Sequence, residues 1–206
     1  SHDLRNPLSV AEGYVDLASE SGDPEHLSKA AEALDRMDEL VGDLLSLARQ
    51  GRAVGETESI SLAALARDAW ASVDTDGAEL VVDDDVAIDA DPTRTCELLE
   101  NVFRNSVEHG RPRDGDTASD SLTVRIGEAS FRDNDGAVGS GFFIEDDGTG
   151  LPEDAVDHIF ECGFTTDEGG TGLGLAITER IAEGHGWEAR AMTGESGGAR
   201  FEFRTG

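Results

Sequence analysis

The sequences DDGTG at residues 146–150 and GGTGLGL at residues 169–175 decide the fold of this chain. The first follows an apolar run at residues 141–144, so the acidic side chain of Asp146 is expected at the end of a strand. The second runs into apolar residues at helical spacing, so a helix is expected to begin in a glycine loop. Such a start suits an anion, because the first N–H groups of a helix have no partner within it. Together the two segments predict a phosphate site, although either one alone is typical of an ordinary turn.

A helix further upstream carries two asparagines, Asn101 and Asn105, four residues apart and therefore on one face. This helix is expected to begin after Asp91 and Pro92, a capping side chain followed by proline at the first helical position. A carboxamide oxygen is a hard, neutral ligand of the kind that Mg²⁺ accepts beside phosphate oxygens and water. The asparagine pair is thus a third element of the predicted site.

In chain order, the motifs at residues 101–105, 146–150, 159–166 and 170–174 resemble the N, G1, F and G2 boxes of histidine kinase ATP-binding domains. The resemblance covers roughly the C-terminal two-thirds of the chain. It implies an α/β sandwich of the Bergerat ATP-binding type, with ATP and Mg²⁺ as cofactors. The nucleotide-binding residues that it implies are Asn101, Asn105, Asp146, Gly148, Gly150, Phe160, Phe164, Thr165, Gly170, Thr171, Gly172, Leu173 and Gly174.

The roles of these residues follow from the resemblance together with their chemistry. Asp146 is expected to accept a hydrogen bond from the adenine amino group, because a carboxylate at a strand end accepts from a donor. Asn105 is the expected Mg²⁺ ligand, and Asn101, one turn earlier, is expected to line the phosphates. Backbone amides of the second glycine segment would contact the β- and γ-phosphates. Residues 152–169 would form a lid anchored by two aromatic side chains that also suit core packing, Phe160 and Phe164.

The chain begins with SHDLRNPL at residues 1–8, which resembles the H box in which histidine kinases phosphorylate themselves. A neutral imidazole is a competent nucleophile when one ring nitrogen is free and the other donates a hydrogen bond. Asp3 can accept that bond from His2, which is therefore the expected phosphoacceptor. Asn6 lies one helical turn after His2. In the resembling family this position orients water for dephosphorylation of a response regulator, and a solvent-facing asparagine is the alternative.

The order of expected elements gives an α+β chain. A helical hairpin at residues 1–50 is followed by a linker at 51–58 and by the ATP-binding domain at 59–206. The hairpin turns at SGDP, residues 21–24, where a glycine, a capping Asp and a proline follow one another. Because two such helices bury little surface between themselves, a homodimer with a four-helix bundle is expected. In the second part, mixed strands with helices on one face form the sandwich, which a hairpin at residues 187–204 closes.

The chain is strongly acidic, with 45 acidic against 16 basic residues, a net charge of −29 and one lysine. A nucleic-acid partner is not expected, because no basic stripe exists to neutralise phosphates. The persistent apolar periodicity argues against disorder. We therefore expect adaptation to high intracellular salt, where a Debye length of about 3 Å at 1 M screens the self-repulsion. In dilute buffer the fold should loosen.

Several features of the sequence are interpreted as having no site of their own. Cys96 and Cys162 lack metal-ligand spacing, and the acidic run at residues 83–85 is expected to be a solvated turn. Three histidines without partners at metal-ligand spacing are expected at the surface, namely His26, His158 and His185. The sequence contains no membrane-spanning run and no signal peptide, so a cytoplasmic location is expected. The abrupt start suggests that more sequence lies upstream in the full protein, where a membrane anchor could also lie.

The expected function is that of a histidine kinase core, which transfers the γ-phosphoryl group of Mg-ATP to His2 and then to an Asp of a response regulator receiver domain. A nucleotide-binding pseudokinase or scaffold is one alternative, because Glu108 stands where many members of the family carry a lysine near the phosphates. Arg104 or Arg111 could supply that charge. A conformational ATPase is the other alternative. Asn101 disfavours it, since hydrolysing relatives carry a general-base Glu at this position.

Overall fold

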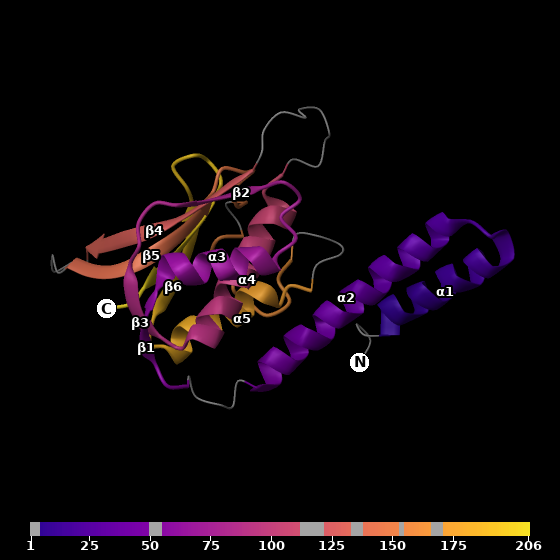
Figure 1. Ribbon diagram of the computed structural model, residues 1–206, viewed down its shortest axis with the longest axis horizontal. Coiled ribbons are helices and arrows are strands. Elements are labelled where there is room, and N and C mark those ends of the chain that lie inside the picture. The colour runs from indigo at the N-terminus through magenta and orange to yellow at the C-terminus, as the bar shows by residue number, and fades with distance from the viewer. Residues whose placement is uncertain (1–4, 50–54, 112–121, 133–137, 153–154, 166–170) are drawn as a thin grey trace. The chain divides into compact units, whose positions relative to one another are not determined.

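The computed structural model describes residues 5–49, 55–111, 122–132, 138–152, 155–165 and 171–206. The chain divides into two compact units, Ser1–Gly51 and Arg52–Gly206 (Figure 1). The helices and strands follow in the order α1 (Arg5–Ser21), α2 (Pro24–Arg49), β1 (Glu58–Ser61), α3 (Leu62–Ser72), β2 (Glu79–Val82), β3 (Ala87–Ala90), α4 (Pro92–His109), β4 (Thr123–Arg132), β5 (Val138–Asp146), α5 (Gly174–Gly184), β6 (Glu188–Thr193) and β7 (Ala199–Arg204).

The first unit is a hairpin of the two helices α1 and α2. Its turn has the caps that the sequence predicts. Gly22 adopts a φ of +71° and its N–H donates to the carbonyl of Ala18 at 2.8 Å, which ends α1. Asp23 Oδ1 accepts the N–H of Glu25 at 3.0 Å and so caps α2. The helices approach closely because the buried side chains between them are small, namely Ala11, Ala30 and Ala33.

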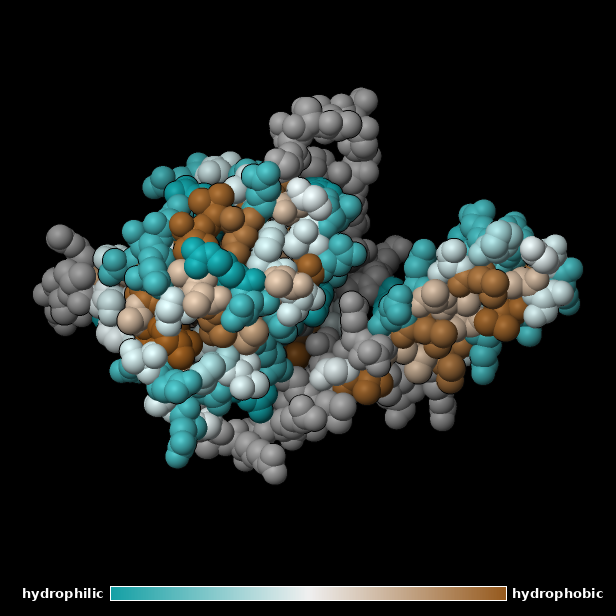
Figure 2. Space-filling model, in the orientation of Figure 1, coloured by the Kyte–Doolittle hydropathy of each residue, from teal (hydrophilic) through white to brown (hydrophobic). Residues whose placement is uncertain are grey.

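Large apolar side chains remain exposed along the hairpin. Figure 2 shows apolar surface over both α1 and α2. Of the large hydrophobic side chains that are exposed in the described part of the chain, one is Val81 of the second unit and the others lie on the hairpin: Leu8, Val10, Val15, Leu17, Leu27, Leu34 and Val41. Among its described residues, the hairpin thus buries mainly alanine between its helices and exposes leucine and valine as an apolar surface that the hairpin itself does not cover.

The second unit is built on a five-stranded mixed sheet in the order β2-β4-β5-β7-β6. β2 runs parallel to β4 and the other neighbours are antiparallel. The helices α3, α4 and α5 lie against one face (Figure 1). Because side chains alternate along a strand, every second residue of β5 and β7 faces these helices. The core between them contains fully buried side chains from both layers, including Phe142, Ile144, Phe201, Phe203, Leu98, Leu99, Val102 and Phe103. The expected α+β class, a helical hairpin followed by an α/β sandwich, is confirmed.

The strands β1 and β3 pair with each other and form a separate two-stranded sheet. The acidic run between β2 and β3 is exposed, as the predicted solvated turn requires, and two of its residues also have partners within the second unit. Asp83 forms an ion pair of 2.7 Å with Arg125 of β4. Asp85 accepts a hydrogen bond of 2.7 Å from the hydroxyl of Ser61, the residue that also caps α3. In this strongly acidic chain, Asp83 and Asp85 each have a specific partner for the carboxylate.

The prediction that His185 is a surface residue holds only in part. This side chain is half-buried at the end of α5 and stacks on Trp187 with 4.3 Å between ring centroids. Its Nε2 accepts the backbone N–H of Asp91 at 3.0 Å, and its Nδ1 lies 2.8 Å from the carbonyl of Ile181. An imidazole that accepts at Nε2 and donates at Nδ1 is neutral. His185 thus joins the end of α5 to the start of α4.

Asp91 is expected to stabilise the second unit as the N-cap of α4. Its Oδ1 accepts the N–H groups of Thr93 and Arg94, and its Oδ2 accepts the N–H of Gly55. Replacing Asp91 with Ala should therefore lower the free energy of unfolding by about 1–2 kcal/mol. Partial burial alone would raise the pKa of Asp91, but these backbone hydrogen bonds lower it below its ordinary 3.8. Denaturant unfolding of both proteins in several molar KCl measures the difference.

The pH dependence of that difference provides a second readout. A carboxyl group with a lowered folded pKa stabilises the fold above its ordinary pKa, and this contribution disappears as the pH falls through the folded pKa. The gap between the parent and Asp91→Ala should be full at neutral pH and should close below the ordinary 3.8. A gap that is already absent at pH 7 would contradict the capping role.

Candidate nucleotide-binding site

The helix α4 places both predicted asparagines beside the start of α5. Asn101 is buried, with 8% of its surface exposed, and Asn105, one turn later, is half-buried. The Oδ1 atom of Asn101 lies 3.9 Å from the point that a Cβ on Gly174 would occupy. Since α4 and α5 pack along each other, the asparagine motif and the second glycine segment meet in the folded chain.

The N-terminus of α5 begins in glycine and lacks a side-chain cap. The N-cap residue, Leu173, makes no capping hydrogen bond, and no described side chain replaces it. Apart from its chain neighbours and its own helix backbone, the described atom that lies within 4 Å of where a Cβ on Gly174 would stand is that Asn101 oxygen. Helix N–H groups without a side-chain cap, next to a neutral carboxamide, form a suitable surface for an anion.

The described part of the predicted lid is tied directly to the second glycine segment. The N–H of Gly163 donates to the carbonyl of Gly172 at 2.9 Å. Gly172 has a φ of +64°, and a Cβ on it would lie 2.5 Å from the carbonyl carbon of Gly163. Phe160 packs edge-on against Phe201 of the core, with 6.5 Å between ring centroids, whereas Phe164 is half-buried. Core packing therefore anchors one aromatic of this segment.

The glycines of the first segment serve contacts within the protein. A Cβ on Gly148 would lie 2.3 Å from the carbonyl oxygen of Gly110, at the end of α4. Gly150 has a φ of +74°, and a Cβ there would lie 2.3 Å from the carbonyl oxygen of Gly197 in the β6–β7 turn. The N–H of Thr149 also donates to Gly110 at 2.9 Å. Gly148 and Gly150 are predicted from the sequence to bind the nucleotide. In the structure, the close approach of other backbone segments already requires glycine at both positions.

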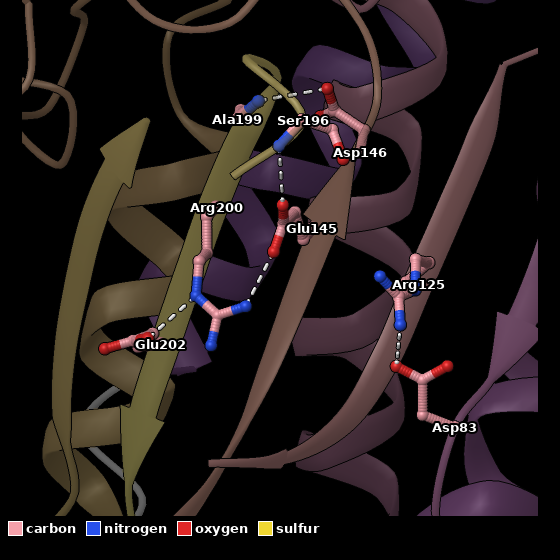
Figure 3. A network of polar contacts seen from close by, with 8 residues as sticks. All are labelled: Asp83, Arg125, Glu145, Asp146, Ser196, Ala199, Arg200 and Glu202. Atoms are coloured by element: carbon pink, nitrogen blue, oxygen red, sulfur yellow. Dashed lines mark hydrogen bonds and ion pairs between the residues drawn. The ribbon is translucent and has the colours of Figure 1, made fainter. Parts of the chain in front are cut away.

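Asp146 lies buried at the end of β5, with 3% of its surface exposed. Its Oδ1 accepts two backbone hydrogen bonds of 3.0 Å, one from the N–H of Gly148 and one from the N–H of Ala199, which Figure 3 shows. Burial raises the pKa of this carboxyl group, and the two N–H groups offset only part of the rise. A buried carboxylate held at one oxygen by rigid backbone donors is well placed to present its other oxygen to a ligand.

Sequence analysis missed two contributors to this site. Ser106 of α4 has a buried hydroxyl close enough to Asp146 to lower its pKa, yet that hydroxyl makes no hydrogen bond of ordinary geometry within the described part of the chain. Ala199 holds Asp146 from the start of β7, just after the β6–β7 turn and 53 residues away along the chain. The glycines at positions 194, 197 and 198 mark that turn in the sequence, but glycine there indicates only a hairpin.

The remaining predicted site residues are placed as follows. His2, Asp3 and Gly170 lie outside the described residues. Asn6 is exposed near the start of α1, Thr165 is exposed, and Thr171 Oγ1 accepts the N–H of Leu173 at 3.2 Å.

Two charged residues considered for the phosphate site, Glu108 and Arg111, are placed as follows. Glu108 is exposed. Arg111 forms an ion pair with Asp76 and also donates to its carbonyl at 2.6 Å. Within the described ranges, no group of three His, Cys, Asp or Glu side chains could hold a metal ion. The carboxamide oxygens of Asn101 and Asn105 are donors of a kind that Mg²⁺ accepts together with phosphate oxygens and water.

Comparison with known proteins agrees with this geometry. The model of the histidine kinase-, DNA gyrase B- and HSP90-like ATPase family matches residues 90–205, and that of the His Kinase A phospho-acceptor domain matches residues 1–53. The chain belongs to the histidine kinase family. The second family match explains why a helical hairpin precedes the ATP-binding fold in this histidine kinase.

Individual relatives are sensor kinases. The chain is 30% identical to the signal transduction histidine-protein kinase AtoS of Escherichia coli, over 98% of this chain and 33% of AtoS. It is 31% identical to the methanogenesis regulatory histidine kinase FilI of Methanothrix harundinacea, over 90% of this chain and 21% of FilI. The chain thus spans a third or less of the length of these relatives.

Solved structures have the same fold over nearly the whole chain. The Acinetobacter baumannii histidine kinase AdeS matches with a TM-score of 0.71 and 18% identity, covering 99% of this chain and 96% of that one. Full-length ShkA, crystallised with AMPPNP, matches with a TM-score of 0.62 and 27% identity, covering 99% of this chain and 44% of ShkA. In the part that the structure describes, no helix has the length and apolar character needed to cross a bilayer.

Replacing Asp146 with Asn should abolish nucleotide binding and still leave the nucleotide-free protein at least as stable as the parent near pH 7. A carboxyl group whose folded pKa is raised destabilises the fold while it is charged, and stability is regained as the pH falls through that pKa. The advantage of the variant should therefore shrink as the pH falls toward the ordinary carboxyl value of 3.8. Thermal unfolding midpoints with and without ATP measure both effects. Unchanged ATP binding would contradict the assignment of this site.

Proposed function

We propose that this chain is the kinase core of a two-component sensor, which binds ATP and transfers its γ-phosphoryl group to His2. The observation that supports this most is that helix α4 connects three elements of the expected site, because its Asn101 lies beside Gly174 and its Ser106 lies beside Asp146. These are the uncapped N-terminus of α5 at Gly174, the carboxamide of Asn101 and the buried carboxylate of Asp146 at the end of the neighbouring strand layer. They offer an anion site and an acceptor for a base in a single fold unit.

Asp146 is proposed to recognise adenine. Its Oδ1 already accepts two backbone hydrogen bonds, so its Oδ2 is the oxygen proposed to accept from the adenine amino group. A guanine carbonyl at the same place would face this carboxylate without a donor, which favours adenine. The buried hydroxyl of Ser106 lies beside the carboxylate and can satisfy a further polar atom of the base, directly or through water.

The phosphates are proposed to lie along the start of α5. Backbone N–H groups of Gly172, Leu173 and Gly174 would contact them, together with Gly170 and Thr171. Asn105 is the proposed ligand of Mg²⁺, with Asn101 beside it, and the cation would neutralise charge on the transferring phosphoryl group. The proposed lid contains Phe160, Phe164 and Thr165. Because the N–H of Gly163 donates to the carbonyl of Gly172, we propose that phosphate binding at the second glycine segment also shifts the lid.

The carboxylates of α4 support phosphoryl transfer to a protein group over hydrolysis. Glu97 is paired with Arg94 at 2.8 Å, and Glu100 accepts a weak hydrogen bond from the thiol of Cys96 at 3.7 Å. Asn101 cannot act as a general base, because a carboxamide does not take up a proton at neutral pH. None of Glu97, Glu100 and Asn101 is therefore proposed as a base for a water molecule near the phosphates.

The transfer itself is proposed as two displacements. A neutral ring nitrogen of His2 attacks the γ-phosphorus, the bond from that phosphorus to the β,γ-bridging oxygen breaks, and ADP leaves. Asp3 accepts a hydrogen bond from the other ring nitrogen and so fixes the tautomer. In the second step, an Asp carboxylate of a response regulator receiver domain takes the phosphoryl group and His2 is regenerated. Asn6, exposed one turn later, is proposed to orient a water molecule that attacks the phosphorus of the receiver's aspartyl phosphate, which frees the carboxylate and releases inorganic phosphate.

A homodimer is proposed to cover the apolar face of the hairpin. At about 100° per residue in two antiparallel helices, the exposed apolar residues divide between two faces. One face carries a continuous set from both helices, namely Leu8, Val15, Leu27, Leu34 and Val41. We propose that this face pairs with a second copy to form a four-helix bundle. Val10 and Leu17 fall on the opposite face with Asn6, where we propose that the receiver domain binds.

The net charge of −29 supports a working environment of high salt, and hence a cytoplasm rich in potassium ions. Among the described residues, many of the basic side chains are already paired with carboxylates, as in the pairs formed by Arg94, Arg111, Arg125, Arg190 and Arg200. Most acidic residues therefore depend on solvent cations for screening.

Incubation of the chain with ATP labelled at the γ-phosphate, in multimolar KCl with Mg²⁺, should produce acid-labile and alkali-stable label on the protein. The variant His2→Gln should bind ATP with unchanged affinity and take up no label. A parent protein that is folded and binds ATP but acquires no label would exclude kinase activity of this chain and would leave the scaffold as the better description. Release of inorganic phosphate without protein label would indicate an ATPase.

The proposed dimer face predicts a specific change of mass. Leu34→Glu places a charge in the centre of that face and should convert the dimer to a monomer at micromolar concentration in high KCl. Val10→Glu adds the same charge on the opposite face and should leave the dimer intact. Light scattering coupled to gel filtration measures both. Two variants with the same mass as the parent would refute the proposed face.

A further inference from the structure

The residue before Asp146 is a buried glutamate that points to the other face of the sheet. Side chains alternate along β5, so Asp146 faces the helices and Glu145 faces away from them. The side chain of Glu145 is only 6% exposed, and its register partner on β7 is Arg200. The nucleotide site proposed above uses none of these atoms, yet they lie directly behind its carboxylate (Figure 3).

Glu145 and Arg200 form a close, partly buried ion pair. Arg200 Nη1 lies 2.6 Å from Glu145 Oε2, and Arg200 Nε donates to Glu202 at 2.8 Å. The guanidinium group also lies over the ring of Phe143, 4.0 Å from its centroid. Burial lowers the pKa of Arg200, but the hydrogen bonds to Glu145 and Glu202 outweigh burial and leave it raised. The guanidinium group is therefore held between an aromatic face and two carboxylates, an arrangement that suits its planar fork of donors.

The same glutamate touches the β6–β7 turn. A Cβ on Gly194 would lie 2.4 Å from Glu145 Oε1, and the N–H of Ser196 points toward this oxygen at 3.5 Å. The turn is closed by the N–H of Gly194, which donates to the carbonyl of Gly198 at 2.8 Å. A Cβ on Gly198 would lie 2.5 Å from Asp146 Oδ1. One turn thus contacts Glu145 on one face of the sheet and Asp146 on the other.

The adjacent residues Ala199 and Arg200 therefore hold the adjacent residues Asp146 and Glu145. The N–H of Ala199 donates to Asp146, and the side chain of the next residue, Arg200, pairs with Glu145. We infer that Glu145 and Arg200 are positioning residues for Asp146, because their ion pair keeps the β6–β7 turn where the N–H of Ala199 reaches the carboxylate. Neither residue contacts the nucleotide. The consequence for nucleotide affinity rests on the proposed function, whereas the positioning of the turn does not.

The charges explain why the arginine matters. Residues 145–147 are three consecutive acidic residues, and Arg200 is the cation that pairs with the buried Glu145. Without it Glu145 would remain as a buried, unpaired charge beside Asp146, which is a costly arrangement. The glutamate would then move toward solvent and displace the turn that packs on it. Asp146 would lose a donor that helps to keep it ionised.

The first test measures the positioning without any nucleotide. Hydrogen exchange of the Ala199 amide is followed by NMR in the parent, Arg200→Gln and Arg190→Gln, all in high KCl. Arg190 is the matched control, because it forms an exposed ion pair with Glu188 on the edge strand β6 of the same sheet. Arg200→Gln should speed exchange of the Ala199 amide by about tenfold or more, which corresponds to about 1.4 kcal/mol. Arg190→Gln should leave it within about twofold of the parent.

The second test measures whether loss of the Arg200–Glu145 ion pair alters nucleotide binding at the proposed site. The ratio of ADP to GDP affinity, measured by calorimetry, should fall several-fold in Arg200→Gln and stay at the parent value in Arg190→Gln. Arg200→Lys, which keeps the charge, should restore most of the ratio. A purely structural role would weaken both nucleotides equally or lower only the unfolding midpoint. Should Arg200→Gln fail to fold, Glu145→Gln removes the opposite charge and is judged by the same two readouts.

The outcomes separate the two levels of inference. Unchanged exchange of Ala199 in the folded Arg200 and Glu145 variants would overturn the positioning role, whatever the nucleotide affinity. Faster exchange with an unchanged ADP to GDP ratio would overturn its effect on the site. If the parent binds neither nucleotide, the proposed function fails, and the exchange experiment alone still decides whether the ion pair positions the turn.

Discussion

The buried carboxylate of Asp146 is the constraint on which much of the second unit depends. A charged carboxylate away from water is costly unless donors surround it. Here backbone N–H groups provide the donors, one from the segment that follows β5 and one from the start of β7. Backbone donors can reach it only if the chain around them approaches very closely. The glycines at positions 148, 150 and 198 meet this need, since a Cβ at any of them would collide with neighbouring backbone or with Asp146 itself.

The phosphate end of the site depends on a different set of contacts. α4 and α5 pack along each other, so the buried Asn101 comes to lie beside Gly174 at the first turn of α5. No described side chain caps that turn. The same helix α4 also ends against the first glycine segment, where Thr149 bonds to Gly110. α4 is therefore the element that fixes the distance between the base end and the phosphate end of the proposed site.

In the hairpin, the residues that can specify a binding partner lie on the outer surface. Its inner surface is alanine, which allows close packing but contributes little apolar area, and its larger apolar residues are exposed. Because the chain is strongly acidic, two copies repel each other less where they meet through exposed leucine and valine than where they meet through carboxylates. The sequence spacing and the exposure of these residues thus lead to the same proposal of a symmetric partner.

The helices and strands, their order and the family follow from the sequence alone. Caps at Gly22, Asp23 and Asp91, strand alternation and the four boxes are local signals, and local physics is enough to interpret them. Which groups from distant segments come into contact is evident only in the folded chain. Three such contacts join segments far apart along the chain. They are the hydrogen bond from Ala199 to Asp146, the hydrogen bond between His185 and the start of α4, and the ion pair of Arg200 with Glu145. No local pattern encodes them, because they arise from strand order and helix packing, and a glycine or histidine has the same appearance in the sequence whether it meets solvent or another segment.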